Sequence, residues 1–110
     1  MKIAMPIQGG KLSQHFGHSE QFSLFEIEDR SIRDREDLTP PPHEPGLLPR
    51  WLKEQGVTLV IAGGMGQRAQ QIFEQAGIEV ICGAPSESPA AVVDSYLKGD
   101  LATGDNACDH

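Results

Sequence analysis

The apolar residues of this chain change their spacing about halfway along it. In the first part, short apolar or alternating runs predict β-strands at residues 2–7, 21–27 and 31–38. In the second part, apolar residues three and four positions apart predict helices at 47–56, 67–77 and 88–99. Two further apolar runs between these helices predict strands at 57–64 and 78–83. The predicted order is therefore β-β-β-α-β-α-β-α.

This order fixes the directions of the strands. Short links make the first three strands an antiparallel meander, and each later strand is reached through a helix, so it runs parallel to the strand before it. The first, third, fourth and fifth strands then point the same way, with the charged strand 31–38 at an edge. The segments that follow these four strands meet at one side of the sheet, which we call the exit edge: residues 8–18, 39–45, 63–66 and 82–88. Ligands bind along this edge in open α/β sheets.

The composition narrows the class of partner. The chain has 110 residues and a net charge of −7, which predicts one domain that binds neither nucleic acid nor anionic membranes. We expect a domain at 1–99 and a tail at 100–110. No apolar run approaches the roughly 20 residues that span a bilayer. Two cysteines without an export signal predict reduced thiols and a cytoplasmic location.

Two loops at the exit edge carry histidine. In HFGH, His15 and His18 flank Phe16 and Gly17, and Gly17 permits a sharp turn that could hold a ligand. The alternative is a surface loop with incidental histidines and one core phenylalanine. His43 lies in a proline-rich loop, where stiff neighbours suit either a ligand or an exposed side chain without a role.

The sequence GGMG, residues 63–66, lies between a predicted strand and a predicted helix. Gly63, Gly64 and Gly66 would bring backbone N–H groups to a helix N-terminus, which favours anions. We expect Gly64 or Gly66 to have a positive φ or to admit a ligand close to the backbone, with Met65 as a soft wall of the site. The alternative is a simple tight turn.

The chain ends in Cys-Asp-His. Cys108 and His110 are ligands for soft and borderline metals, but two ligands do not complete a zinc site, which needs four. His15, His18 or His43 could supply the others if the tail folds back. The alternative is a frayed tail. Cys82, in an apolar strand, is predicted to be a small core residue.

Taken together, HFGH, a histidine before the first helix, VTLVIAGGMGQRA and the terminal CDH resemble the dinitrogenase iron–molybdenum cofactor biosynthesis family, of the NifX and NifB C-terminal-domain type. The resemblance covers essentially the whole chain. Gly56, Val57 and Thr58 stand where nitrogenase-linked members often carry a cysteine, and there is one histidine near position 43 where other relatives have several. These departures indicate a stand-alone member.

The resemblance implies a ribonuclease H-like three-layer fold with a five-stranded mixed sheet and three helices. It also implies a non-enzymatic protein that binds or carries an iron–sulfur or molybdenum-containing cluster. Its partners would be unidentified cluster donor or acceptor proteins, and we expect a monomer or weak dimer. The implied cofactor-binding residues are His15, Phe16, Gly17, His43, Gly63, Gly64, Met65 and Gly66, and the implied metal ligands are His15, His43, Cys108 and His110.

Two alternatives belong to other classes. A ribonuclease H-like nuclease would hold two metals with carboxylates that begin in the first strand, and residues 2–7 contain none. The remaining alternative is a regulatory module that binds an anion or nucleotide at the GGMG turn. Such a module would not depend on Cys108.

Overall fold

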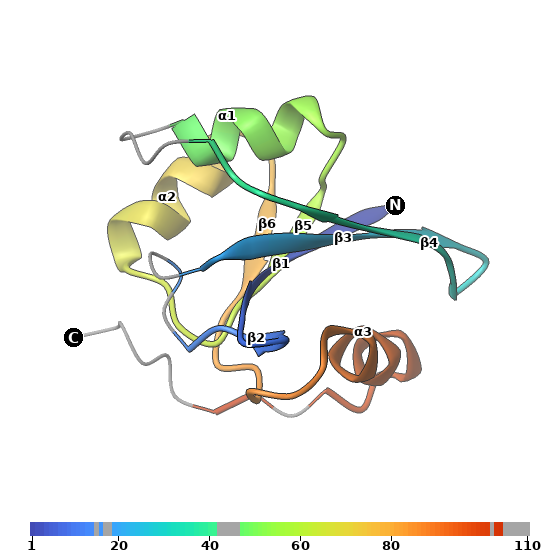
Figure 1. Ribbon diagram of the computed structural model, residues 1–110. Coiled ribbons are helices and arrows are strands. Elements are labelled where there is room, and N and C mark those ends of the chain that lie inside the picture. The colour runs from blue at the N-terminus through green and yellow to red at the C-terminus, as the bar shows by residue number, and fades with distance from the viewer. Residues whose placement is uncertain (15, 17–18, 42–46, 102, 105–110) are drawn as a thin grey trace.

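A mixed β-sheet forms the centre of the molecule (Figure 1). The computed structural model describes residues 1–14, 16, 19–41, 47–101 and 103–104. The strands are β1 (Lys2–Gln8), β2 (Lys11–Leu12), β3 (Gln21–Glu28), β4 (Ser31–Leu38), β5 (Leu59–Ile61) and β6 (Glu79–Ile81). Their order in the sheet is β4-β3-β1-β5-β6, and the short β2 pairs with β1.

The predicted strand directions are confirmed. β1 is antiparallel to β3, and β3 is antiparallel to β4, whereas β1 and β5, and then β5 and β6, are parallel. β1, β4, β5 and β6 therefore end at the same edge of the sheet. β2 is an addition to the predicted five strands, since two residues are too few to give an alternating pattern.

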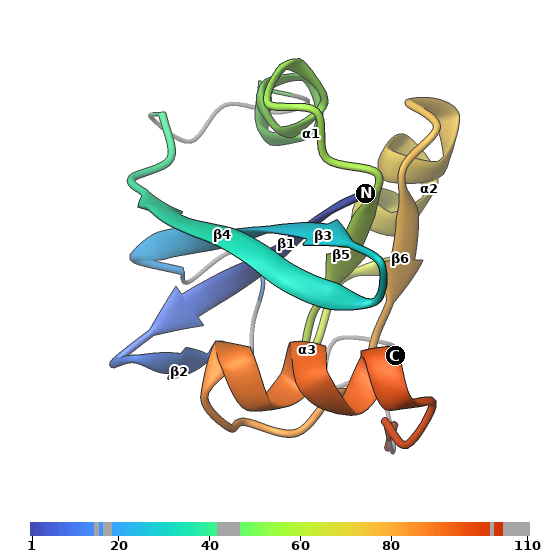
Figure 2. The same cartoon turned by 90° about the vertical axis from the view of Figure 1, so that its right-hand side faces the viewer.

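Helices cover both faces of the sheet (Figures 1 and 2). Helices α1 (Leu47–Glu54) and α2 (Gln67–Gln75) lie on one face, and α3 (Pro89–Lys98) lies on the other. The predicted three-layer α/β class, with three helices and a mixed sheet, is confirmed. No helix in the described part of the chain is long and apolar enough to cross a membrane.

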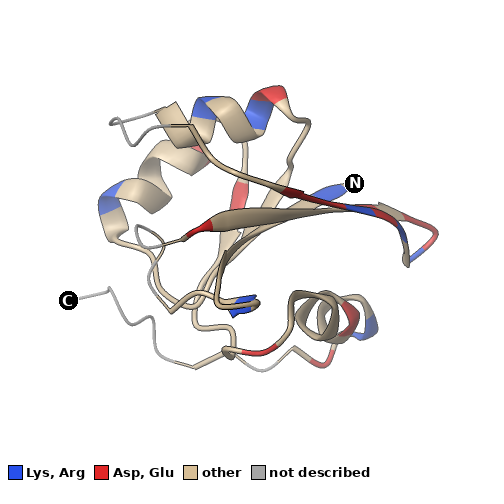
Figure 3. Ribbon diagram, viewed as in Figure 1, with Lys and Arg blue, Asp and Glu red and all other residues tan. Residues whose placement is uncertain are grey.

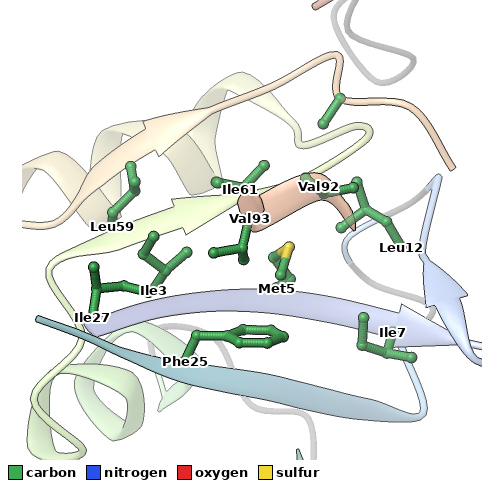
Figure 4. Packing of buried hydrophobic residues seen from close by; sticks show 11 residues of the cluster. Ile3, Met5, Ile7, Leu12, Phe25, Ile27, Leu59, Ile61, Val92 and Val93 are labelled. Atoms are coloured by element: carbon green, nitrogen blue, oxygen red, sulfur yellow. The ribbon is translucent and has the colours of Figure 1, made fainter. Parts of the chain in front are cut away.

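Each face of the sheet has its own hydrophobic core, because successive residues of a strand point to opposite sides. Ile3, Met5 and Ile7 of β1 point toward α3, where they pack with Phe25 and Val92 (Figure 4). The core on the other face, called here the α2-side core, includes Ala4, Phe22, Leu24, Leu52, Val60 and Phe73. Burial on both faces explains why β1 is an almost continuous apolar run.

β4 is a charged edge strand, as predicted. The Arg35 guanidinium lies 5.3 Å from the centre of the Phe25 ring, and its Nε donates to Asp37 Oδ1 at 3.0 Å. Ser23 Oγ also donates to Asp37 Oδ1, at 2.7 Å. Burial raises the pKa of the Asp37 carboxyl, but the bonds from Arg35 and Ser23 and the Arg35 charge outweigh burial, so this pKa lies below its ordinary value.

Candidate functional site

The GGMG turn joins two neighbouring segments of the exit edge. The Phe16 N–H donates to the Gly64 carbonyl at 3.0 Å, and the Gly83 N–H donates to the Gly63 carbonyl at 2.9 Å. Phe16 comes from the loop between β2 and β3, and Gly83 comes from the segment after β6. The sequence prediction that these three segments meet is therefore confirmed for the described residues.

The glycines of this turn differ in whether the structure requires them. A Cβ atom on Gly63 would lie 2.8 Å from the Ser13 carbonyl oxygen and 3.1 Å from the Gln14 Cα, so only glycine lets the two backbones approach this closely. Gly66 has φ −61°, and a Cβ there would meet no atom within 4 Å. Of the two alternatives expected for Gly64 or Gly66, a positive φ is wrong, since neither is among the described glycines with positive φ, and the close approach of a ligand stays a prediction. The steric requirement of the turn is close packing of Gly63 against Ser13 and Gln14.

The N-terminus of α2 follows this turn and has no side-chain cap. Gly66 is its N-cap residue, no side-chain cap hydrogen bond is present among the described residues, and the first turn contains no acidic residue. The only charged side chain in the first turn of α2 is Arg68, and this end of the helix is blue in Figure 3. Unsatisfied N–H groups and the helix dipole make such an end favourable for a negative charge.

Met65 has a buried side chain, and its predicted role as a wall of the site stays a prediction. It is fully buried in the α2-side core, and its carbonyl oxygen accepts a hydrogen bond from Gln70 Nε2 at 2.9 Å.

Phe16 anchors the HFGH loop. Its ring is half-buried and makes edge-to-face contacts with Phe22 and Phe73, at centroid distances of 5.6 and 5.5 Å. The Ser19 hydroxyl donates to the Phe16 carbonyl at 3.2 Å. Phe16 is thus the core phenylalanine that the sequence allowed for, and it fixes one end of the peptide unit that links it to His15.

The chain after α3 returns to the exit edge. Leu101 packs against the core beneath α3, and the Gly104 N–H donates to the Gly83 carbonyl at 2.7 Å. Cys82 is half-buried and packs against the α2-side core, but it directly follows β6 and does not lie within the strand as predicted. The sequence did not predict the contact between Gly83 and Gly104. A glycine after a strand indicates a turn, but it does not indicate which other segment will bind to that turn.

The comparisons with known proteins agree with this geometry. A family model described as "Dinitrogenase iron-molybdenum cofactor" matches residues 1–99. The chain belongs to this family. The match ends at Gly99, so Cys108 and His110 lie beyond the matched residues.

Known proteins match this family member over most of their own length. MJ0580 of Methanocaldococcus jannaschii is 34% identical over 106 residues, which cover 92% of this chain and 89% of that protein. The crystal structure of PH0822 is 30% identical, with a TM-score of 0.87 and 94% of both chains covered. The apo form of the orange protein from Desulfovibrio gigas is 20% identical, with a TM-score of 0.75 and coverage of 96% of this chain and 93% of that one. This last likeness shows the shared fold.

The predicted metal ligands of this family member lie outside the described residues. They are His15, His43, Cys108 and His110, and the same holds for Gly17 and His18. Within the part of the chain that the structure describes, no group of three or more histidine, cysteine or acidic side chains is arranged to hold a metal ion. The assignment of these four ligands therefore stays a prediction from the sequence.

Proposed function

We propose that this protein binds and carries an iron–sulfur or molybdenum-containing cluster at the exit edge, without catalysing a reaction. The observation that carries the proposal is the hydrogen bond between Phe16 N–H and Gly64 O, because it joins the HFGH loop to the GGMG turn. Membership of the dinitrogenase iron-molybdenum cofactor family supports a cofactor-related role.

The donors available near this edge suit such a cargo. His15 directly precedes the anchored Phe16, and the tail that carries Cys108 and His110 leaves from Gly104 beside Gly83. Thiolate and imidazole are soft or borderline ligands that bind iron, copper and zinc. His43 follows β4, which ends at the same edge.

The glycine turn would contribute without a covalent bond. Metal–sulfide cores are anionic, and the uncapped N-terminus of α2 offers backbone N–H groups and the positive end of a helix dipole. Few thiolates and several backbone donors suit a cluster that must leave again for an acceptor protein. A closed set of four cysteines would retain it.

The proposal also covers the absence of nuclease chemistry, the partner proteins and the tail. Lys2–Gln8 of β1 contains no carboxylate, which argues against the two-metal chemistry of ribonuclease H-like nucleases. Cluster donor and acceptor proteins are the proposed partners of a cytoplasmic monomer or weak dimer. We propose the residues after Gly99 as the tail that completes the site.

Anaerobic purification followed by iron, molybdenum and sulfide analysis tests this function. We expect metal and sulfide to copurify with the wild-type protein and to be lost from Cys108→Ala. Cys82→Ala is the matched control, since it removes the other thiol at a position that packs against a core. A protein that never acquires sulfide-bound metal, before or after reconstitution with iron and sulfide, would contradict the proposal. Equal loading of Cys108→Ala and wild type would favour an anion-binding module instead.

A further inference from the structure

We propose that Gly83 is a positioning residue for the cluster site, because its contact with Gly104 holds the C-terminal tail at the exit edge. This inference rests on the proposed function, in which the tail supplies Cys108 and His110. It assigns a role to a residue that sequence analysis did not include among the candidates.

Gly83 links the tail to the glycine turn through the backbone. Its N–H donates to the Gly63 carbonyl at 2.9 Å, and its carbonyl accepts from the Gly104 N–H at 2.7 Å. Gly63 in turn packs against Ser13 and Gln14 of the loop between β2 and β3. Four segments that are far apart in the sequence are thereby connected in a row, with Gly83 between the glycine turn and the tail.

The conformation and the surroundings of Gly83 both exclude a side chain. Its φ is +82°, which residues with a Cβ rarely adopt. A Cβ at this position would overlap the Gly104 carbonyl oxygen and would lie 2.9 Å from the Gly104 carbonyl carbon and 3.1 Å from its nitrogen. All three are backbone atoms, so no side-chain rotation relieves the clash, and the tail itself must move.

Holding the tail at Gly104 shortens the tether of its ligands. Cys108 lies four positions after Gly104, seven after Leu101 and nine after Gly99. Effective concentration falls with about the −3/2 power of tether length, so releasing Gly104 should weaken binding by about two- to threefold or more.

Gly77 provides a matched control. It also has φ +82°, but a Cβ there would meet no atom within 4 Å. Gly77→Ala and Gly83→Ala therefore introduce the same kind of backbone strain, and only Gly83→Ala displaces the tail. Gly104→Pro is a second variant, because it removes the N–H donor without adding a side chain to the segment after β6.

The experiment measures tail docking and metal binding separately. Hydrogen exchange of the Gly104 amide reports the contact itself, and calorimetric titration with Zn²⁺ reports the affinity, since thiolate and imidazole are usual zinc ligands. We expect both Gly83→Ala and Gly104→Pro to lose the contact with the tail. In Gly83→Ala this loss is measured as faster exchange of the Gly104 amide. Both variants should bind Zn²⁺ about twofold more weakly than wild type, or more weakly still. Gly77→Ala should match wild type in both measurements.

Truncation after Gly104 shows whether Gly83 acts through the tail. In the truncated chain, Gly83→Ala should cause no further loss of Zn²⁺ affinity, because the ligands it positions are gone. Unchanged affinity in Gly83→Ala despite fast exchange at Gly104 would overturn the inference and leave the proposed function intact. Equal losses in Gly77→Ala and Gly83→Ala would also overturn it. Absence of metal binding in the wild type would overturn both.

Discussion

At the scale of single residues, adjacent glycines of the same turn have different roles. Gly63 packs its backbone against Ser13 and Gln14, whereas Gly66 has an ordinary φ and open space around it. The sequence predicts the turn, but it does not reveal which glycine is sterically required, because that depends on a loop about fifty positions away.

Gly63→Ala and Gly66→Ala test this difference. We expect Gly63→Ala to lower the free energy of unfolding by about 1–3 kcal/mol, since both close atoms belong to backbone that cannot rotate away. Gly66→Ala should change it by less than about 0.5 kcal/mol, because a weaker N-cap is offset by a less flexible unfolded chain. Urea denaturation measures both. A larger loss in Gly66→Ala than in Gly63→Ala would contradict the packing argument.

Asp37 gives a pH-dependent prediction. Its pKa is lowered in the folded protein from an ordinary value of 3.8, so its ionised form stabilises the fold above that value, and this contribution is lost as the pH falls through the folded pKa. The side chain is 42% exposed, which limits the effect to about 0.5 kcal/mol. Asp37→Asn should therefore be less stable than wild type at about pH 6 and closer to it at about pH 2.5. An equal difference at both pH values would show that the charge of Asp37 has no part in it.

At the scale of elements, the sequence predicted the main strands and helices because each has a clear period or a clear end. Ser88, Pro89 and Gly99 mark the ends of α3 as predicted, and Gly99 is the left-handed C-cap. β5 (Leu59–Ile61) is shorter at both ends than the predicted strand 57–64, whose last two residues belong to the GGMG turn. The contact between Gly83 and Gly104 could not be predicted, because it joins two backbones and involves no side chain.

Capping α2 should separate stability from binding. Gly66→Asp adds a side-chain acceptor at the N-cap, which we expect to raise the free energy of unfolding by about 0.5–1 kcal/mol. The same carboxylate occupies the N–H groups and repels an anionic cluster, so cluster affinity should fall. Gly66→Asn is the control, because it caps the helix without the charge. If Gly66→Asp loads with a reconstituted cluster as wild type does, the helix end is not part of the site.

Two truncations divide the tail into a packed part and a ligand-bearing part. Ending the chain after Gly104 keeps Leu101 and the Gly83 contact, so the thermal midpoint should stay nearly unchanged while bound metal falls. Ending it after Asp100 also removes the half-buried Leu101 and should cost about 1–2 kcal/mol. Thermal unfolding followed by circular dichroism measures both. A midpoint that falls by many degrees on removal of residues 105–110 alone would make those residues part of the folded core.

At the scale of the whole molecule, the topology brings together segments that are far apart in the sequence. Four strands end at one edge, and the segments after β1, β5 and β6 are connected there by backbone hydrogen bonds. This much followed from the sequence, because strand directions depend only on the order of strands and helices. The ligand set stays a prediction, since the positions of imidazole and thiol groups in loops depend on local packing that the spacing of apolar residues does not reveal. We propose that these segments form one site.

A double-mutant cycle of His15→Ala and Cys108→Ala tests that claim most directly. The two residues are 93 positions apart in the sequence, and cluster affinity is measured by anaerobic titration of the wild type, both single variants and the double variant. If both residues serve one cluster, each single change weakens binding, and the double change costs less than the sum of the two. Losses that add strictly would show that His15 and Cys108 act separately, and the shared site at the exit edge would then be wrong.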